Sequence, residues 1–511
     1  MLANLKLKNS FKYHVIPVII LLLTAFYFSC ATRYFPLGIG NYGHDAGIFS
    51  SVGHAINSGR ILYTEIWENK GPLIYFINAL GVKINYFYGI YFIELLAMCI
   101  TVIFMYKIAL IISLKNRYVS VMSSIFSIAP LCVTLEGGNL SESYALPFLC
   151  IACFVAVDFF YSNLLIKRLN IVLFGICCGA VLTLRTNICA FPFAIIIVIL
   201  TVLISKNEWS KLISATLFSF TGLTISILPF VAYFSINNVW SDYFQAAFGV
   251  FEYFEKGRKH KILQCVMSMF GNLSKCGTLY IIILFFVVFL ILKNKINNAL
   301  KYCLWMVFLG LILNTIGNSL VAVVHNHYFM TFIPIILIPI AWFLSELFKK
   351  IAKNKISAEV AVIAITLFLI SPAIPDLFNI VIWNIGDKIP HNDVERFILD
   401  NSVESETVQC IGINNTTNYK VKRLSASKHI HFAAGIFTDK AKNIIANETA
   451  QDISKNNAKI IIFGDIDRFE NFLGYLDNKS DFEQFIEKNY AKIKINKNIV
   501  FFKKNRNLLK L

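Results

Sequence analysis

Long apolar runs dominate this sequence and restrict it to folds that a lipid bilayer can hold. Stretches long enough to cross about 30 Å of hydrocarbon predict about eleven membrane-spanning helices. The predicted spans are Tyr13–Thr32, Phe87–Leu114, Ser120–Leu135, Ser141–Tyr161, Leu169–Leu184, Ile188–Ser205, Leu212–Ile236, Leu279–Leu292, Tyr302–Val321, Tyr328–Phe348 and Val360–Ile382. With 57% hydrophobic and only 15% charged residues, the chain of 511 residues is too apolar for a soluble protein. We therefore expect a polytopic α-helical membrane protein.

The positions of lysine and arginine predict which ends of these spans face the cytoplasm. The basic clusters at residues 6–12, 115–117 and 349–355 fall on one side of the membrane, which the positive-inside rule makes cytoplasmic. The N-terminus is then cytoplasmic, and the loop around Asp45 and the segment after residue 385 are extracytoplasmic. This topology explains most of the net charge of +17. Since no basic and aromatic binding motif accompanies the charge, we expect the lipid bilayer as a partner and no nucleic acid.

Composition divides the chain near residue 385. Residues 386–511 are polar, with short β-branched runs at 407–412 and 459–463 and a predicted hairpin that pairs 491–495 with 499–503. Two stretches between these runs, 441–454 and 467–476, are predicted helices, with Asp467 as a candidate N-cap. We expect a transmembrane domain over residues 1–385, with a first outer loop at 33–72, and a small extracytoplasmic α/β domain over residues 386–511.

The first outer loop carries an acid and a lysine that invite a chemical explanation. Asp45 precedes apolar residues at 48, 49, 52, 55 and 56, a helical period that places it at or near the N-cap of a short surface helix. Lys70 precedes Gly71-Pro72 and a second apolar segment, where an ammonium suits a lipid-linked phosphate. Capping and snorkelling explain each residue alone. Their presence in one loop favours chemistry, with His44 and Glu68 as further candidates for a substrate cavity.

Two further charged residues are predicted on the same face of the membrane. Glu142 lies in the first turn of the fourth predicted span, where the helix dipole favours a carboxylate. Arg185 interrupts two apolar runs, and an arginine in that setting usually pairs with a carboxylate or a phosphate. Tyr144, His327 and Tyr328 complete the candidates for the cavity.

Metal and thiol chemistry have little support in the sequence. The pair His325 and His327 is a weak metal signal, because no third ligand lies near it in the sequence. An interfacial belt position explains at least one of the two histidines. Most of the 12 cysteines fall inside predicted spans, where they act as small apolar residues. We therefore assign no metal ligand.

An aromatic and basic stretch at residues 240–259 is predicted to form an interfacial amphipathic helix. Such a helix suits two roles. It serves as a lid over a lipid substrate, or it only anchors the protein.

The order of these motifs along the chain resembles the bacterial members of the GT-C glycosyltransferase superfamily. These are membrane enzymes that use polyprenyl-phosphate sugars and are related to protein O-mannosyltransferases and aminoarabinose transferases. The resemblance covers roughly residues 13–382 and rests on Asp45, Lys70-Gly71-Pro72, Glu142, Leu184-Arg185-Thr186-Asn187 and His327-Tyr328. It implies a transferase that moves a hexose or pentose from a polyprenyl phosphate to a cell-envelope glycan, lipid or protein on the outer face of the bacterial cytoplasmic membrane.

The resemblance also implies roles for individual residues. Asp45 matches the acid of the first loop, the general base, and Lys70 matches the lysine that contacts the donor phosphate. Glu142 matches a second acidic position, so it joins Asp45 as a candidate catalytic residue, and Arg185 is a further candidate for the phosphate. Ala46 stands where the family often has a second acid, which weakens a metal site built on paired acids. We expect inversion at the anomeric carbon, with no required cofactor and an optional divalent metal.

Three other functions stay open at this point. A polysaccharide polymerase or ligase that uses pyrophosphate-linked glycans would share the number of spans, but it normally places its key residues in one large late loop that this chain lacks. A transporter would show paired repeats, and none is visible in the sequence. A non-enzymatic sensor would not need Asp45 and Lys70 together.

Overall fold

The computed structural model describes most of the chain, and its residues form two compact units. The described residues are 2–38, 40, 42–248, 261–275, 277–292, 296–319, 324–351, 360, 363–364, 367–368, 371–386, 390–414, 416–430 and 437–504. The first unit combines Met1–Ile39, Tyr91–Pro229 and Lys259–Asp387, and the second combines Gly40–Ile90, Phe230–Arg258 and Lys388–Leu511.

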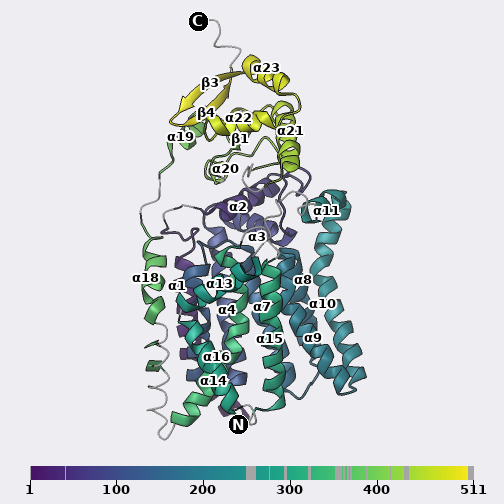
Figure 1. Ribbon diagram of the computed structural model, residues 1–511, viewed down its shortest axis with the longest axis vertical. Helices are drawn as coiled ribbons and strands as arrows, with labels where there is room; N and C mark the ends of the chain where they lie inside the picture. The colour runs from purple at the N-terminus through teal and green to yellow at the C-terminus, as the bar shows by residue number, and fades with distance from the viewer. Residues whose placement is uncertain are drawn as a thin grey trace. The chain divides into compact units, whose positions relative to one another are not determined.

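The first unit is a bundle of helices (Figure 1). Its elements are α1 (Leu2–Cys30), α4 (Gly89–Ile112), α5 (Arg117–Ile128), α6 (Leu131–Thr134), α7 (Ser141–Tyr161), α8 (Arg168–Leu184), η1 (Thr186–Cys189), α9 (Ala190–Ser205), most of α10 (Trp209–Ile236), α13 (Lys261–Lys275), α14 (Thr278–Leu292), α15 (Asn298–Ser319), η3 (Asn326–Phe332), α16 (Ile333–Ile351), η4 (Ser371–Ala373) and α18 (Ile374–Ile382). Helices α7, α9 and α15 pack against one another, and α16 packs against α5.

Seven helical segments of the described residues are long and apolar enough to cross a membrane. They are Gly89–Ile112, Arg117–Thr134, Ser141–Tyr161, Thr186–Ser205, Trp209–Ile236, Asn298–Ser319 and Asn326–Ile351. Three shorter apolar helices, His14–Cys30, Pro72–Ile84 and Arg168–Leu184, include two of the predicted spans. The predicted span at 279–292 coincides with α14. The predicted spans at 302–321 and 360–382 lie partly outside the described residues.

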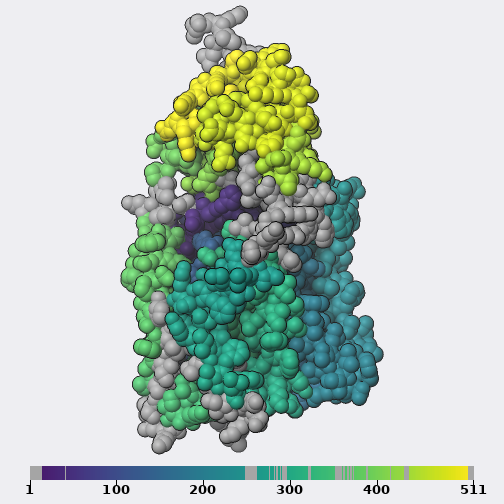
Figure 2. Space-filling view, viewed as in Figure 1, coloured from purple at the N-terminus to yellow at the C-terminus, as the bar shows by residue number. Residues whose placement is uncertain are grey.

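The outer helices of the first unit expose apolar side chains, whereas α16 is buried. On α10, Leu217 and Phe220 are more than 60% exposed, and so is Trp305 on α15. The teal residues of α14 and α15 form a broad part of the surface seen in Figure 2. Apolar surface of this extent is unfavourable in water and is expected where lipid covers a protein. The segment Asn326–Ile351 is instead buried within the structure, so η3 and α16 form its centre.

The second unit contains a small mixed sheet with helices on both faces. Its elements are α2 (His44–Asn57), α3 (Pro72–Ile84), α11 (Trp240–Phe248), α19 (Asp393–Asn401), β1 (Val408–Ile411), α20 (Thr417–Lys420), α21 (Asp439–Lys455), β2 (Ile460–Phe463), α22 (Ile466–Gly474), α23 (Lys479–Asn489), β3 (Tyr490–Ile495) and β4 (Asn498–Lys503). The strand order is β1-β2-β4-β3, in which β1 and β2 are parallel and the other pairs antiparallel.

Successive side chains of a strand point to opposite faces of the sheet, so each face has its own hydrophobic core. Phe463 and Phe501 face α21, α22 and α23, whereas Ile462 and Val500 face α19. The predicted terminal hairpin is confirmed, with a turn one residue shorter than expected because Ile495 pairs with Asn498.

The two helices predicted between the strands are confirmed as α21 and α22. The N-cap prediction for α22 is wrong. Asp465, not Asp467, accepts the hydrogen bond from the Arg468 N–H.

The loop between the first two apolar segments packs on the C-terminal α/β elements within this unit. The Trp67 N–H donates to the Lys428 carbonyl at 2.9 Å, and the Trp67 ring lies 5.4 Å from that of His429. Farther along, the ring of Tyr86 stacks on that of Tyr419 at 4.8 Å. The loop that carries Asp45 and Lys70 is therefore part of the same compact unit as the C-terminal sheet. Of the predicted amphipathic helix at 240–259, α11 covers residues 240–248, and residues 249–259 lie outside the described residues.

Candidate active-site residues

Asp45 lies at the start of α2, as its sequence context predicts. It is the second residue of the helix, and Gly43 occupies the N-cap position. The half-buried carboxylate thus lies in the first turn, where the helix dipole favours its charged form. Helix α2 packs closely on α3: a Cβ atom on Gly53 would lie 2.7 Å from the backbone of Asn78 and Ala79. This contact fixes the direction of the helix that carries Asp45.

Two tyrosines hold the backbone of Lys70. The Lys70 N–H donates to the Tyr75 hydroxyl oxygen at 3.0 Å, and the Lys70 carbonyl accepts from the Tyr63 hydroxyl at 2.9 Å. The half-buried ammonium donates to the Asn69 side-chain oxygen at 3.2 Å. Within the described part of the chain, no carboxylate lies within ion-pair distance of Lys70. A fixed ammonium with only a neutral partner can bind an anion without first breaking an ion pair.

Tyr63 fixes this loop at a cost in backbone strain. Its φ of 73° is uncommon for a bulky residue. The side chain is 1% exposed and its ring contacts those of Tyr75, Phe234 and Tyr243. Burial, with the nearby Tyr243 and Glu68, raises the pKa of Tyr63 well above its usual value, so the hydroxyl stays a donor. Sequence reasoning gave no role to Tyr63, which belongs to no motif, or to Tyr75, which ends the run that begins with Lys70-Gly71-Pro72.

His44 and Glu68, the other candidates in this loop, differ in exposure. His44 is exposed at the first residue of α2, whereas the Glu68 side chain is 4% exposed. Glu68 and Asp45 both act electrostatically on the Tyr75 hydroxyl, the group that accepts from Lys70. Three of the predicted residues, Asp45, Glu68 and Lys70, therefore interact with one tyrosine in the second unit.

The first unit holds a second cluster, centred on Arg185. Its Nη1 lies 2.6 Å from Glu142 Oε1, and its Nη2 donates to the Tyr328 hydroxyl oxygen at 3.0 Å. The guanidinium also lies 4.4 Å from the centroid of the Tyr328 ring. The Glu142 side chain is 1% exposed, and that of Arg185 is 14% exposed. The structure thus pairs the predicted arginine with the predicted carboxylate. Part of its charge is already neutralised before any phosphate arrives.

Tyr144 supports the turn between α6 and α7. Its buried hydroxyl donates to Asn139 Oδ1 at 3.1 Å, and the Asn139 N–H donates to Glu94 Oε1. Residues 136–139 all have positive φ, at 46°, 91°, 76° and 51°. Two of the four are glycines, which adopt this conformation without steric cost.

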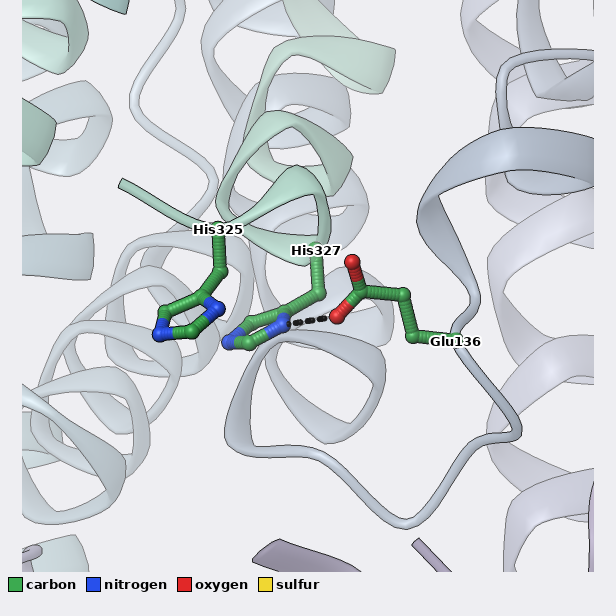
Figure 3. Close-up of side chains that lie close together, drawn as sticks. All are labelled: Glu136, His325 and His327. Carbon is green, nitrogen blue, oxygen red and sulfur yellow. Dashed lines mark hydrogen bonds and ion pairs between the residues drawn. The ribbon is translucent and has the colours of Figure 1, made fainter. Parts of the chain in front are cut away.

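This turn presents Glu136 to the two histidines before α16. Nδ1 of the buried His327 lies 2.6 Å from Glu136 Oε2, and the rings of His325 and His327 stack at 5.2 Å (Figure 3). Ligand atoms of these three residues lie within 4.8 Å of one another, close enough to hold a metal ion. The sequence offers no third ligand near the histidines because Glu136 is 191 positions from His327. No short-range motif could have found it.

Gly138→Ala should destabilise the protein, because the turn that carries Glu136 has no room for a Cβ atom. With φ at 76°, the added atom would lie 2.6 Å from Glu94 Oε1 and 2.8 Å from a Thr32 methyl. We expect a loss of about 1–3 kcal/mol in the free energy of unfolding, measured by denaturation in detergent micelles. The control Gly271→Ala meets no atom within 4 Å in α13. It should be neutral or slightly stabilising, and equal losses in both variants would contradict the account of the turn.

Comparison with known proteins identifies the fold. Residues 39–370 match the family described as putative competence-induced protein Ccs4 N-terminal domain. No curated protein matches the chain. The crystal structure of ArnT from Cupriavidus metallidurans bound to undecaprenyl phosphate is similar with a TM-score of 0.61 and 11% identity, over 95% of this chain and 97% of that one. The apo structure of that ArnT is similar with a TM-score of 0.62 and 10% identity, over 96% of this chain and 98% of that one.

The oligosaccharyltransferase from Archaeoglobus fulgidus is a more distant structural relative. Its complex with Zn and sulfate gives a TM-score of 0.50 and 13% identity, over 95% of this chain and 73% of that one. ArnT and this enzyme are both GT-C glycosyltransferases. The expected fold class is therefore confirmed. The chain has a GT-C type membrane fold with a small C-terminal sheet domain.

Proposed function

This chain belongs to the family of the putative competence-induced protein Ccs4 N-terminal domain, and from that premise and its GT-C fold we propose that it is a membrane glycosyltransferase with a polyprenyl-phosphate sugar as donor. The observation that carries the proposal is that Tyr63 and Tyr75 hold the backbone of Lys70, and that Asp45 acts on the same Tyr75. The ArnT structure contains undecaprenyl phosphate, which supports this class of donor here.

Lys70 binds the donor phosphate in this proposal. Its backbone is held at both the N–H and the carbonyl, so phosphate binding costs little backbone entropy. Arg185, with its side chain oriented by Glu142 and Tyr328, is a further candidate for the phosphate. The proposal includes no required metal.

Asp45 acts as the general base in a single displacement. It takes the proton of the acceptor hydroxyl while the acceptor oxygen bonds to the anomeric carbon. The bond from that carbon to the phosphate oxygen breaks at the same time, and its electron pair leaves with the phosphate. Lys70 stabilises the charge that develops on the leaving group. One base on one side of the sugar gives inversion of configuration.

The reaction takes place at the outer face of the bacterial cytoplasmic membrane. The positive-inside distribution of basic residues places the first outer loop and the C-terminal domain on that side. The sugar is a hexose or a pentose, and the acceptor is a glycan, lipid or protein of the cell envelope. The candidates for substrate contact in this proposal are His44 and Glu68 in the second unit, and Tyr144, His327 and Tyr328 in the first.

Lys70→Gln should lower the efficiency with which the protein uses the lipid donor. We expect kcat/KM for the donor to fall about 10–100-fold, because one charge-assisted contact to the phosphate is lost. The measurement is transfer of radiolabelled sugar from purified polyprenyl-phosphate donors in liposomes.

The matched control for this variant is Lys83→Gln. Lys83 is exposed in the last turn of α3 and has no role in the proposal. It should leave kcat/KM unchanged. An unaltered value in Lys70→Gln would remove Lys70 from the donor site.

A further inference from the structure

Glu136, His325 and His327 form a group of metal-ligand types, of which the proposed function uses only His327, as a candidate for substrate contact. The histidines come from the residues at and just before η3, and the carboxylate comes from the turn between α6 and α7. Figure 3 shows the two imidazoles side by side, with Nδ1 of His327 directed at the Glu136 carboxylate. Glu136 and His325 are exposed and His327 is 4% exposed, so an ion can enter from one side and meet a buried ligand.

The chemistry of the three donors selects the type of ion. Two imidazole nitrogens with one carboxylate suit zinc and related transition metals, whereas calcium and magnesium prefer oxygen ligands. Zinc held by three protein ligands keeps a fourth position for water or another ligand. Bond lengths of about 2.0–2.2 Å would place the ligand atoms about 3.4 Å apart around a tetrahedral ion. The three ligand atoms now lie within 4.8 Å of one another, so binding must bring them closer together.

The backbone on both sides of the group is held in place. Turn residues 136–139 are locked by their left-handed conformation and by the hydrogen bond of Asn139 to the buried Glu94. On the other side, η3 residues 327–332 are buried. Metal ligands on two fixed segments lose little conformational entropy when the ion binds, which favours affinity.

We propose that Glu136, His325 and His327 bind a divalent transition-metal ion, with Zn²⁺ the best match, and that this ion ties the turn at 136–139 to η3. The ion takes the place of the hydrogen bond between His327 and Glu136. The His327 ring packs edge-on against that of Tyr328, at 4.6 Å, and the Tyr328 hydroxyl accepts from Arg185. The ion therefore acts as a positioning element for the arginine cluster. This last role rests on the proposed function, whereas metal binding itself does not.

Metal content tests the binding. The full-length protein, purified in detergent, is stripped with a chelator, incubated with Zn²⁺ and analysed by elemental mass spectrometry after desalting. We expect about one zinc per chain, as for a three-ligand site, and a Zn²⁺-dependent rise in the midpoint of thermal unfolding. His325→Ala and Glu136→Gln should each lose the zinc and the rise. Because both positions are exposed, the variants should unfold at the wild-type midpoint without metal.

A matched control separates this site from other histidines. His391 also lies beside a carboxylate, 3.3 Å from Glu395, but the described residues give it no second histidine as a partner ligand. His391→Ala should keep the zinc and the thermal response. Zinc bound equally by all three variants, or by none of the four proteins, would overturn the proposal. This test measures zinc content and thermal unfolding, not sugar transfer. Its result therefore does not depend on whether the proposed function holds.

Discussion

Asp45→Asn should lower the turnover number for sugar transfer about 10²–10⁴-fold, the usual contribution of a positioned general base. The amide keeps the shape of the side chain in the first turn of α2, but it cannot take the proton of the acceptor hydroxyl. Binding of the lipid donor should change little, because the phosphate contacts come from other residues. The measurement combines initial rates of radiolabelled transfer in liposomes with a separate assay of polyprenyl-phosphate binding.

Asp242→Asn is the matched control for this prediction. Asp242 also lies in the first turn of a short helix in the same unit, and it accepts a hydrogen bond from Thr64 at 2.5 Å. It should lose a similar interaction with its helix dipole, worth about 0.3–1 kcal/mol, without affecting the rate. If both variants slowed transfer equally, the interaction with the helix dipole would explain Asp45, and its role as a base would be lost.

Glu142→Gln should destabilise the first unit strongly, because it leaves the guanidinium of Arg185 without its carboxylate. Removing one partner of a buried ion pair typically costs about 3–5 kcal/mol, since the remaining charge stays desolvated. The partial exposure of Arg185, 14% of its side chain, argues for the lower end of that range. The free energy of unfolding in mixed micelles gives the value. Because Arg185 then loses its orientation, kcat/KM for the donor should fall as well.

An exposed ion pair of the same unit provides the comparison. Lys167 Nζ lies 2.7 Å from Asp158 Oδ2, with 43% and 18% of the two side chains exposed. Asp158→Asn should cost no more than about 1 kcal/mol, because water screens such pairs. A loss in Glu142→Gln as small as that in Asp158→Asn would contradict a tightly coupled Glu142–Arg185 pair.

Features that depend on neighbouring residues were predictable from the sequence. Apolar length predicted the helices that span the bilayer, and helical spacing after Asp45 predicted α2. The positive charge of Arg185 between two apolar runs predicted an anionic partner. In the structure that partner is Glu142. In each of these cases the signal lies within one helix or results from the cost of leaving a charge alone in an apolar setting.

Features that depend on the approach of distant segments were not predictable. Glu136 meets His327 because the left-handed turn at 136–139 directs it toward η3, and the sequence between them contains no trace of that contact. Tyr63 and Tyr75 hold Lys70 through hydrogen bonds to its backbone, which no side-chain motif encodes. The α22 cap was misplaced by two residues because Asp465 and Asp467 both suit a helix start, and only backbone geometry distinguishes them.

The most direct test of the proposed function is transfer by the purified protein in liposomes from synthetic polyprenyl-monophosphate sugars, with the products identified by mass spectrometry and NMR. The account predicts release of free polyprenyl phosphate together with a glycosylated acceptor of inverted anomeric configuration. Transfer only from pyrophosphate-linked glycans, retained configuration in the product, or no transfer from any monophosphate donor would contradict it.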